Sequence, residues 1–319
     1  MHLAKLRTLG VKVESTEGTY DAPGAADAIM LIEEPNWNPI IEKADRPAVR
    51  NTLTPLQKVR TLGKVEITFS FEMKGEDTTA DSIPSWAKIF TAAGFLVTQN
   101  VGTSVAITPS DALSSFATIP SYSLLAQLDG YALPVRGARV ASMALNCVVG
   151  DRWVCTVTMN GILEGDDWDT SSLFDPSFST QLPEVWHDDG VFTLDATPIK
   201  VARMAIDMGI EGDWRPDPNQ QYGLCSWAVG GRAITGQLDP EFDPATLDYL
   251  EKLVTDTRLA LVAKQRVGVT GKSLDIAMPY IEVDDHPEAQ RGPIQVVDYT
   301  FAASGLATGE ADEFTLTKQ

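Results

Sequence analysis

The segment from Lys64 to Lys74 alternates strictly between apolar and polar side chains, and this pattern restricts the possible folds most strongly. The apolar members are Val65, Ile67, Phe69, Phe71 and Met73, and the polar members between them are Glu66, Thr68, Ser70 and Glu72. Successive side chains of a strand point to opposite faces, so the pattern predicts a strand with one buried and one solvated face. Similar alternation over 139–149 and 152–162 predicts a long hairpin that turns at Gly150 and Asp151.

The stretch from Arg232 to Ala263 predicts a strand, a capped helix and another strand. Asp243 suits the N-cap of the helix, and Pro244 suits its first position, where a missing N–H breaks no helical bond. Three apolar residues then recur at helical spacing, namely Leu247, Leu250 and Val254. So short a helix is unstable alone in water, and we expect it to pack on a sheet. Another short helix is predicted over 84–94, between Pro84 and Gly94.

These elements predict a mainly β chain with two short helices, built as β-sandwich or barrel units. Each half has the order strand, long loop, strand, helix and three strands, which suggests a duplicated β-β-α-β-β-β unit. In the first half, the leading strands and helix are expected at 36–43, 64–74 and 84–93, and in the second at 200–210, 233–238 and 244–256. We therefore divide the chain into a first unit with an N-terminal arm and a loop at 44–63 (1–165), a linker (166–196), a second unit (197–308) and a mobile tail (309–319).

Composition excludes several classes of function. The chain has 319 residues and a net charge of −19, which argues against a general nucleic-acid-binding surface, because such a surface needs Lys and Arg to neutralise phosphates. It has no run of about 20 apolar residues that would span a membrane, and its N-terminus lacks the pattern of a signal peptide. The three cysteines, Cys147, Cys155 and Cys225, form no even disulfide set, which favours synthesis in the cytoplasm with free thiols.

Motifs for catalysis or cofactor binding are incomplete. The segment Gly268–Ser273 (GVTGKS) imitates the end of a phosphate-binding loop, but Arg266 stands where the first glycine belongs, and two strands flank it instead of a helix. The carboxylates around Asp239 resemble a calcium loop, but its required glycine and glutamate are replaced by Pro244 and Leu250. No histidine has a partner at metal-ligand spacing. We therefore expect no cofactor, no metal and no enzymatic activity.

A basic patch occurs between two predicted strands of this acidic protein. It contains Arg46, Arg50, Lys58, Arg60 and Lys64. One interpretation is an arm that docks on an acidic face of another subunit. The alternative is an ordinary solvated loop, since charged loops face water.

Several segments together resemble the tail tube (major tail) proteins of tailed bacteriophages, in particular the long, two-unit kind. They are KVESTEGTYDAP near the start, RPAVRNTLTPLQKVRTLGKVEITFSFEMKG, LPVRGARVASMALNCVVGDRWVCTVTMNGIL, and PIKVARMAIDMGIEGDWRPDPNQQYGLCSWAVGGRAITGQLDPEFDP with its helix. No single motif has the specificity of a catalytic signature, and the order of many weak ones carries the resemblance.

The resemblance implies a structural virion protein whose subunits form rings that stack into a hollow tail tube. Strands would close a barrel across subunits, with three two-unit chains making a pseudo-hexameric ring, or alternatively six chains. The tube would surround the tape-measure protein, meet tail-tip and tail-terminator proteins, and conduct the genome into the host. The protein would then reside in the virion tail after synthesis in the host cytoplasm.

A channel wall of the same charge sign as DNA would keep phosphates from binding. Three acidic residues on polar strand faces are candidates for lining the channel: Glu66, Glu72 and Asp207. Ordinary solvent exposure explains each of them equally well. The basic patch would bridge neighbouring rings in this interpretation.

Two other functions stay open from the sequence. The same fold would serve a tail completion or connector protein, or the inner tube of an injection machine. A monomeric carbohydrate-binding β-sandwich is the alternative from another class, because tryptophans provide stacking platforms for sugars. Its candidate platforms are Trp37, Trp153, Trp168, Trp186 and Trp214.

Overall fold

The computed structural model describes residues 7–47, 54, 56–110, 119–165, 168–187, 189–243, 251, 254–255, 257–285, 287–305 and 311–319. Its strands form one 17-stranded sheet and two hairpin sheets, so the prediction of a mainly β chain is confirmed. The predicted helix at 84–94 is confirmed as α1, whereas the helix predicted over 244–256 lies almost wholly outside the described residues.

The elements of the first half, in chain order, are β1 (Arg7–Val13), η1 (Ala25–Asp27), β2 (Ala28–Ile29), β3 (Asn36–Ala44), β4 (Val59–Glu72), α1 (Ala87–Ala92), β5 (Phe95–Asn100), β6 (Ser104–Pro109), β7 (Tyr122–Leu128), β8 (Tyr131–Val148) and β9 (Val154–Leu163). Those of the second half are β10 (Val191–Leu194), β11 (Thr197–Pro198), β12 (Arg203–Asp207), β13 (Ile210–Pro216), η2 (Gln221–Gly223), β14 (Leu224–Arg232), β15 (Thr235–Leu238), β16 (Leu259–Lys264), β17 (Leu274–Asp285), β18 (Glu288–Arg291), β19 (Ile294–Val297), β20 (Tyr299–Ala303) and β21 (Thr315–Lys318).

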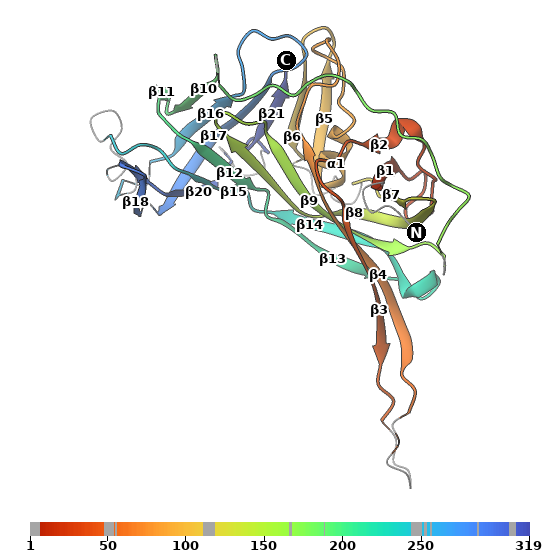
Figure 1. Cartoon of the computed structure of the whole chain (residues 1–319). Helices are drawn as coiled ribbons and strands as arrows, with labels where there is room; N and C mark the ends of the chain where they lie inside the picture. Colours follow the sequence, from red (N-terminus) through yellow and green to blue (C-terminus); the bar gives the residue numbers. More distant parts are fainter. Residues whose placement is uncertain are drawn as a thin grey trace.

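A central sheet of eight antiparallel strands runs through both halves in the order β3-β4-β9-β8-β12-β15-β20-β17. The pairing of β8 with β12 joins the two halves (Figure 1). The predicted hairpin over 139–162 is confirmed as β8 and β9, with Gly150 at a positive φ of 84° in the turn. Glycine adopts this conformation without steric cost.

A second layer covers one face of the central sheet and encloses the core. β7 and β1 continue from the first part of β8, while β16 and β10 continue from the first part of β17. Helix α1 lies in this layer and buries Trp86 and Phe90. The Trp86 ring stacks on Phe71 of β4 with 6.2 Å between centroids, so the helix is held by the apolar face that the alternation predicts.

The two halves repeat one strand register. Trp37 of β3 lies opposite Ile67 of β4, and Ile206 of β12 lies opposite Gly236 of β15. Both members of the second pair follow those of the first by the same number of positions in the chain. The hairpin of β13 and β14 keeps this register, because Ile210 opposite Arg232 repeats Ile41 opposite Gly63.

The C-terminus differs from the predicted mobile tail. β21 pairs with β17 on one side and with β6 on the other. Phe314 and Leu316 are buried, and the buried ammonium group of Lys318 donates hydrogen bonds to the carbonyl oxygens of Thr79 and Ser82. The described part of the tail therefore closes the outer layer of the second half onto the first half.

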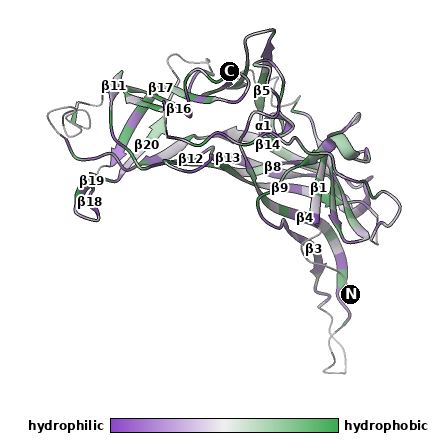
Figure 2. Cartoon of the chain, turned by 45° about the horizontal axis from the view of Figure 1, so that its top comes forward, coloured by the Kyte–Doolittle hydropathy of each residue, from purple (hydrophilic) through white to green (hydrophobic). Residues whose placement is uncertain are grey.

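The hairpin of β3 and β4 projects far beyond the rest of the protein, as two views show (Figures 1 and 2). We call residues 41–63, its outer part, the arm. The loop predicted over 44–63 is shorter than expected, because β4 already begins at Val59 and pairs there with Ala44. A strand that the sequence analysis did not predict, β1, pairs with β7 along its whole length ahead of the segment that follows it.

Candidate assembly surfaces

The face of the central sheet that points away from the core is polar, and we call it the polar face. Residues on it alternate with buried ones, as in β9, where exposed Thr156 lies between buried Cys155 and Val157. Small polar side chains recur on neighbouring strands, among them Thr68, Thr158, Asn146, Thr235 and Gln237. Near the base of the arm, η2 and β14 cover part of this face: Ile162 of β9 packs there on Tyr222 and Leu224. Over the other strands many of its described side chains meet solvent.

Two of the three predicted channel-lining acids are exposed on this polar face. Glu66 lies opposite Asn160 of β9, and Asp207 lies opposite Thr235 of β15. Glu72 differs, because its carboxylate pairs with Arg152 at 2.9 Å and its side chain is only 16% exposed. Its charge is largely neutralised, which argues against Glu72 as an open channel-lining acid.

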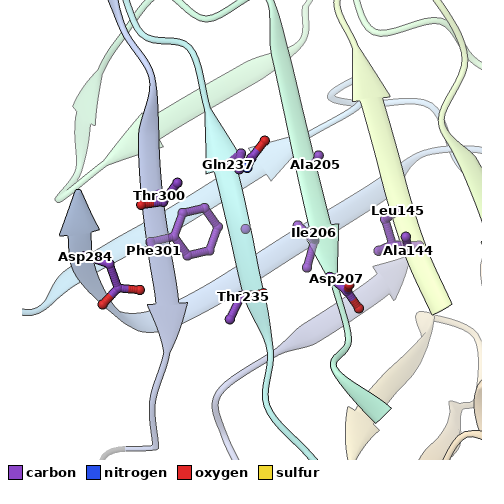
Figure 3. Close-up of a pocket in the computed structure, with 11 residues that line it drawn as sticks. Ala144, Leu145, Ala205, Ile206, Asp207, Thr235, Gln237, Asp284, Thr300 and Phe301 are labelled. Carbon is purple, nitrogen blue, oxygen red and sulfur yellow. The ribbon is translucent and has the colours of Figure 1, made fainter. Parts of the chain in front are cut away.

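Sequence reasoning missed a further acid on the same face. Asp284 of β17 is exposed and lines a shallow pocket together with Asp207, Thr235 and Thr300 (Figure 3). Alternation alone does not say which of the adjacent acids Asp284 and Asp285 faces away from the core. A register shift between Val283 and Asp285 leaves Asp284 on the polar face.

The cations of the basic patch are mostly engaged within the protein. Lys58 pairs with Asp45 at 3.0 Å, and Lys64 pairs with Glu42 at 2.7 Å, both across the arm. The guanidinium of Arg60 lies 4.4 Å from the centre of the Tyr222 ring. Arg46 lies near the outer end of the arm, beyond β3, and Arg50 lies outside the described residues. Of the described cations in the basic patch, Arg46 is therefore the one best placed to contact another chain.

The base of the arm is held by the hairpin of β13 and β14. Tyr222 packs so closely on Gly63 that a Cβ there would lie 2.7 Å from the ring, so this position requires glycine. Trp214 stacks edge-on with Trp227 at 5.1 Å, and the Lys64 ammonium lies 5.5 Å from the Trp214 ring. A small apolar cluster therefore fixes the direction in which the arm leaves the body.

An ionic clamp joins the N-terminal segment to both halves. Glu17 accepts hydrogen bonds from Arg139 of β8 at 2.9 Å and from Arg215 of β13 at 2.5 Å. The guanidinium of Arg139 is buried and also donates to the carbonyl oxygens of Ile119 and Trp227. The carbonyl acceptors and the Glu17 carboxylate together offset the cost of burying the Arg139 charge. Removal of the carboxylate would leave that buried charge without its counter-ion.

We expect the Glu17 clamp to make stability depend on acid pH. Burial alone would raise the pKa of Glu17, but hydrogen bonds from Arg215, Ser226 and Arg139 outweigh it and lower the pKa to about 2 from an ordinary 4.5. The stabilisation is therefore complete above pH 4.5 and is lost as the pH falls through 2; with allowance for solvent screening, it amounts to about 1–2 kcal/mol. Urea unfolding of Glu17→Gln should show this deficit at pH 6 and only a small part of it near pH 2. A constant deficit across that range would contradict the pKa assignment, and exposed Glu211→Gln is the control.

The tryptophans do not provide the sugar platforms of the carbohydrate-binding alternative. Trp153 and Trp186 are buried and pack edge-on at 5.7 Å, and Trp214 is engaged with Trp227. Trp37 is half-buried beneath the Arg7 guanidinium, which lies 4.9 Å from the ring centre. Of the five candidates, only Trp168 is exposed. A row of accessible rings, which sugar binding requires, is therefore missing among the described residues.

The part of the chain that the structure describes contains neither a metal-binding cluster nor a membrane-spanning helix. There, no group of three or more His, Cys, Asp or Glu side chains is arranged to hold a metal ion. No helix in that part is long and apolar enough to cross a membrane.

Comparison with known proteins agrees with this architecture. A search of curated proteins finds no match. The family model described as phage tail tube protein matches residues 5–305, which includes the central sheet, the arm and both halves. A match over nearly the whole sequence establishes the family. The chain therefore belongs to the phage tail tube protein family.

Proposed function

We propose that three copies of this chain close into a ring and that rings stack into the hollow tube of a phage tail, the conduit for the genome. The supporting observation is the central sheet of eight strands, whose polar face is exposed outside the part that η2 and β14 cover. The repeated register supports two equivalent units per chain, so three chains would form a pseudo-hexameric ring. Closure across copies would also protect the strand edges at both ends of the sheet from aggregation.

The width of the channel favours three copies over six. Strands lie about 4.8 Å apart and tilt by about 40° in barrels, so three sheets of eight strands close to a backbone cylinder about 50 Å across, and six sheets to about 95 Å. Side chains narrow the smaller cylinder to a bore of roughly 40 Å. A DNA duplex, with grooves about 8 Å deep on either side of its base pairs, is roughly 20 Å wide. The trimeric ring thus fits one duplex, while the hexameric ring would be far wider than its cargo.

The polar face suits a channel wall past which DNA moves. Its neutral Thr, Ser, Asn and Gln side chains do not attract phosphates, and Glu66, Asp207 and Asp284 repel them. The exposed Arg203 on this face has a carboxylate, that of Asp298, at 3.8 Å. In this role the protein is a component of the virion tail made in the host cytoplasm, and it needs no catalytic chemistry. Its partners would be other copies of itself, the tape-measure protein inside the tube, and the tail-tip and tail-terminator proteins at its ends.

Electron microscopy of the purified protein over a range of concentrations, with light scattering, tests the proposal. We expect annuli with a central hole and stacked tubes, with three chains per ring. Single rings that never stack, even with tail-tip complexes as seeds, would favour a completion or connector protein. Monomers at every concentration would contradict assembly altogether.

Reversal of charge on the polar face should make the tube retain DNA. Glu66→Lys changes an exposed side chain, so we expect normal folding and tubes, but with a ring of positive charge in each layer. Wild-type tubes should pass a short duplex freely in a co-sedimentation assay, and variant tubes should retain at least ten-fold more at low salt and release it at high salt. Asp175→Lys, an equal charge change on the exposed linker, is the control. Equal retention by the two variants would contradict a channel-lining position for Glu66.

A further inference from the structure

The contact between the two halves of one chain is a strand pair. β12 runs antiparallel to the last residues of β8, with Ile206 opposite Leu145 and Ala205 opposite Asn146. Leu145 in turn lies opposite Cys155, and Cys155 lies opposite Phe71. One row of residues therefore crosses the junction in the order Phe71, Cys155, Leu145, Ile206.

The second half contains equivalents of the first three residues of this row, but not of the fourth. Ile67 and Gly236 are equivalent in register, so Pro240, just beyond the end of β15, is the counterpart of Phe71, each four positions further along the chain. The Val297 amide of β19 donates a hydrogen bond to the Pro240 carbonyl oxygen at 3.0 Å, and Val297 lies opposite Glu288 of β18. The equivalent row in the second half therefore consists of Pro240, Val297 and Glu288. Among the described residues, no strand lies beside Glu288 in the way that Ile206 of β12 lies beside Leu145 in the first half.

The counterpart of Ile206 is Trp37, at the other end of the central sheet. Within the described residues, β3 has β4 as its strand partner and β18 has β19, so each has one edge without a strand. Both edges are accessible, with Glu34, Asn36 and Glu288 all exposed.

We propose that residues 34–38 of one copy pair antiparallel with residues 287–291 of a second copy, in the register of β12 on β8. Trp37 then lies opposite Glu288, Asn36 opposite Ala289, and Glu34 opposite Arg291. This inference rests on the ring proposed above and specifies which edges meet in it and at which residues.

The charges at the two edges are complementary in this register. Arg7 lies over the Trp37 ring and within 3.7 Å of Glu34, so a cation stands where Glu288 of the second copy would arrive. Glu34 itself would meet Arg291, whose guanidinium already pairs with Asp239 at 3.0 Å and with Glu241 at 3.1 Å, so Glu34 would join an existing ion-pair network. A shift by one residue would place Glu34 beside Gln290 and turn every side chain of the pair to the opposite face.

Prolines explain why such edges do not pair indiscriminately. Pro35 and Pro39 lie on or beside β3, and Pro287 directly precedes β18. Each proline lacks an N–H, so the pairing between copies has fewer ladder hydrogen bonds than the pairing of β12 with β8. An incorrect partner strand would therefore be stabilised only weakly by backbone hydrogen bonds at these edges. Charge complementarity would then make a larger contribution to selection of the correct register.

Site-directed disulfide formation tests the register. In a Cys225→Ser background, we combine Asn36→Cys with Ala289→Cys, which the proposal places opposite each other; Cys147 and Cys155 are buried. A disulfide needs Cα atoms within about 7 Å, so only closely opposed positions react. Oxidation of assembled protein should convert most chains into covalent dimers and trimers, without larger species, because the ring closes at three. The control pair, Ile40→Cys with Ala289→Cys, lies four residues out of register and should react at least ten-fold less.

The outcomes separate this inference from the proposed function. Rings seen by electron microscopy without a cross-link at 36 and 289, or with a stronger one in the control pair, would overturn the register and leave the tube intact. Absence of rings in the parent protein would overturn both. As a second variant, Glu288→Lys brings a cation to Arg7 and should raise the concentration needed for ring formation at least ten-fold. An unchanged concentration would also overturn the register.

Discussion

Replacement of residues 45–58 by Asn-Gly should leave rings intact and abolish their stacking into tubes. Ala44 and Val59 are paired, so a two-residue Asn-Gly turn can close the hairpin there without disturbing the strands. The replacement removes Arg46, whereas the contacts at the base of the arm involve Lys64, Tyr222 and Trp214, which remain. A loss limited to longitudinal contacts is therefore expected, with tubes replaced by single annuli in electron micrographs.

A milder variant separates the charge of the arm from its length. Arg46→Gln should weaken stacking and its dependence on salt, because charged contacts between subunits are screened at higher ionic strength. Lys58→Gln, whose wild-type ammonium pairs with Asp45 within the arm, is the matched control and should have less effect. Tubes of normal length from the shortened protein would show that stacking uses another surface.

The strands and their faces could be predicted from sequence because alternation is a local property. Val65, Ile67 and Phe69 are all buried, and Glu66 between them is exposed, as the two-residue period requires. The family resemblance was likewise carried by the order of local motifs along the chain. Local patterns of this kind can be recognised without knowing which strands pair with each other.

Features that depend on contacts between distant segments could not be predicted. Lys64 appeared to be one of five available cations, but it lies beside Glu42 because of the hairpin register and near Trp214 because another hairpin covers the arm. Asp284 reached the polar face through a register shift that no local pattern signals. Glu72 was predicted to line the channel, but its carboxylate forms an ion pair with Arg152, its neighbour across the sheet. A sequence shows which residues are charged, but the tertiary structure decides which groups these residues pair with.

The C-terminal strand gives the clearest case, and its removal should be strongly destabilising. Phe314 is fully buried and packs edge-on against Phe95 with 5.9 Å between ring centroids. Truncation of a buried phenylalanine to alanine leaves a cavity and costs about 3–5 kcal/mol. We therefore expect Phe314→Ala to lower the free energy of unfolding by that amount in urea titrations of the unassembled protein. The polar composition of residues 309–319 predicted a mobile tail, because the sequence does not show that β6 and β17 are its neighbours.

The adjacent residue supplies a matched control for this prediction. Thr315 lies on the same strand with a half-exposed side chain, and Thr315→Ala should change stability by less than about 0.5 kcal/mol. Because β21 joins β17 of the second half to β6 of the first, loss of Phe314 should also reduce the cooperativity with which the two halves unfold. A deficit below 1 kcal/mol for Phe314→Ala, with a single sharp transition, would instead mean that the tail contributes little. In that case the pairing of β8 with β12, the Glu17 clamp and the packing of β14 on the first half would hold the two halves together.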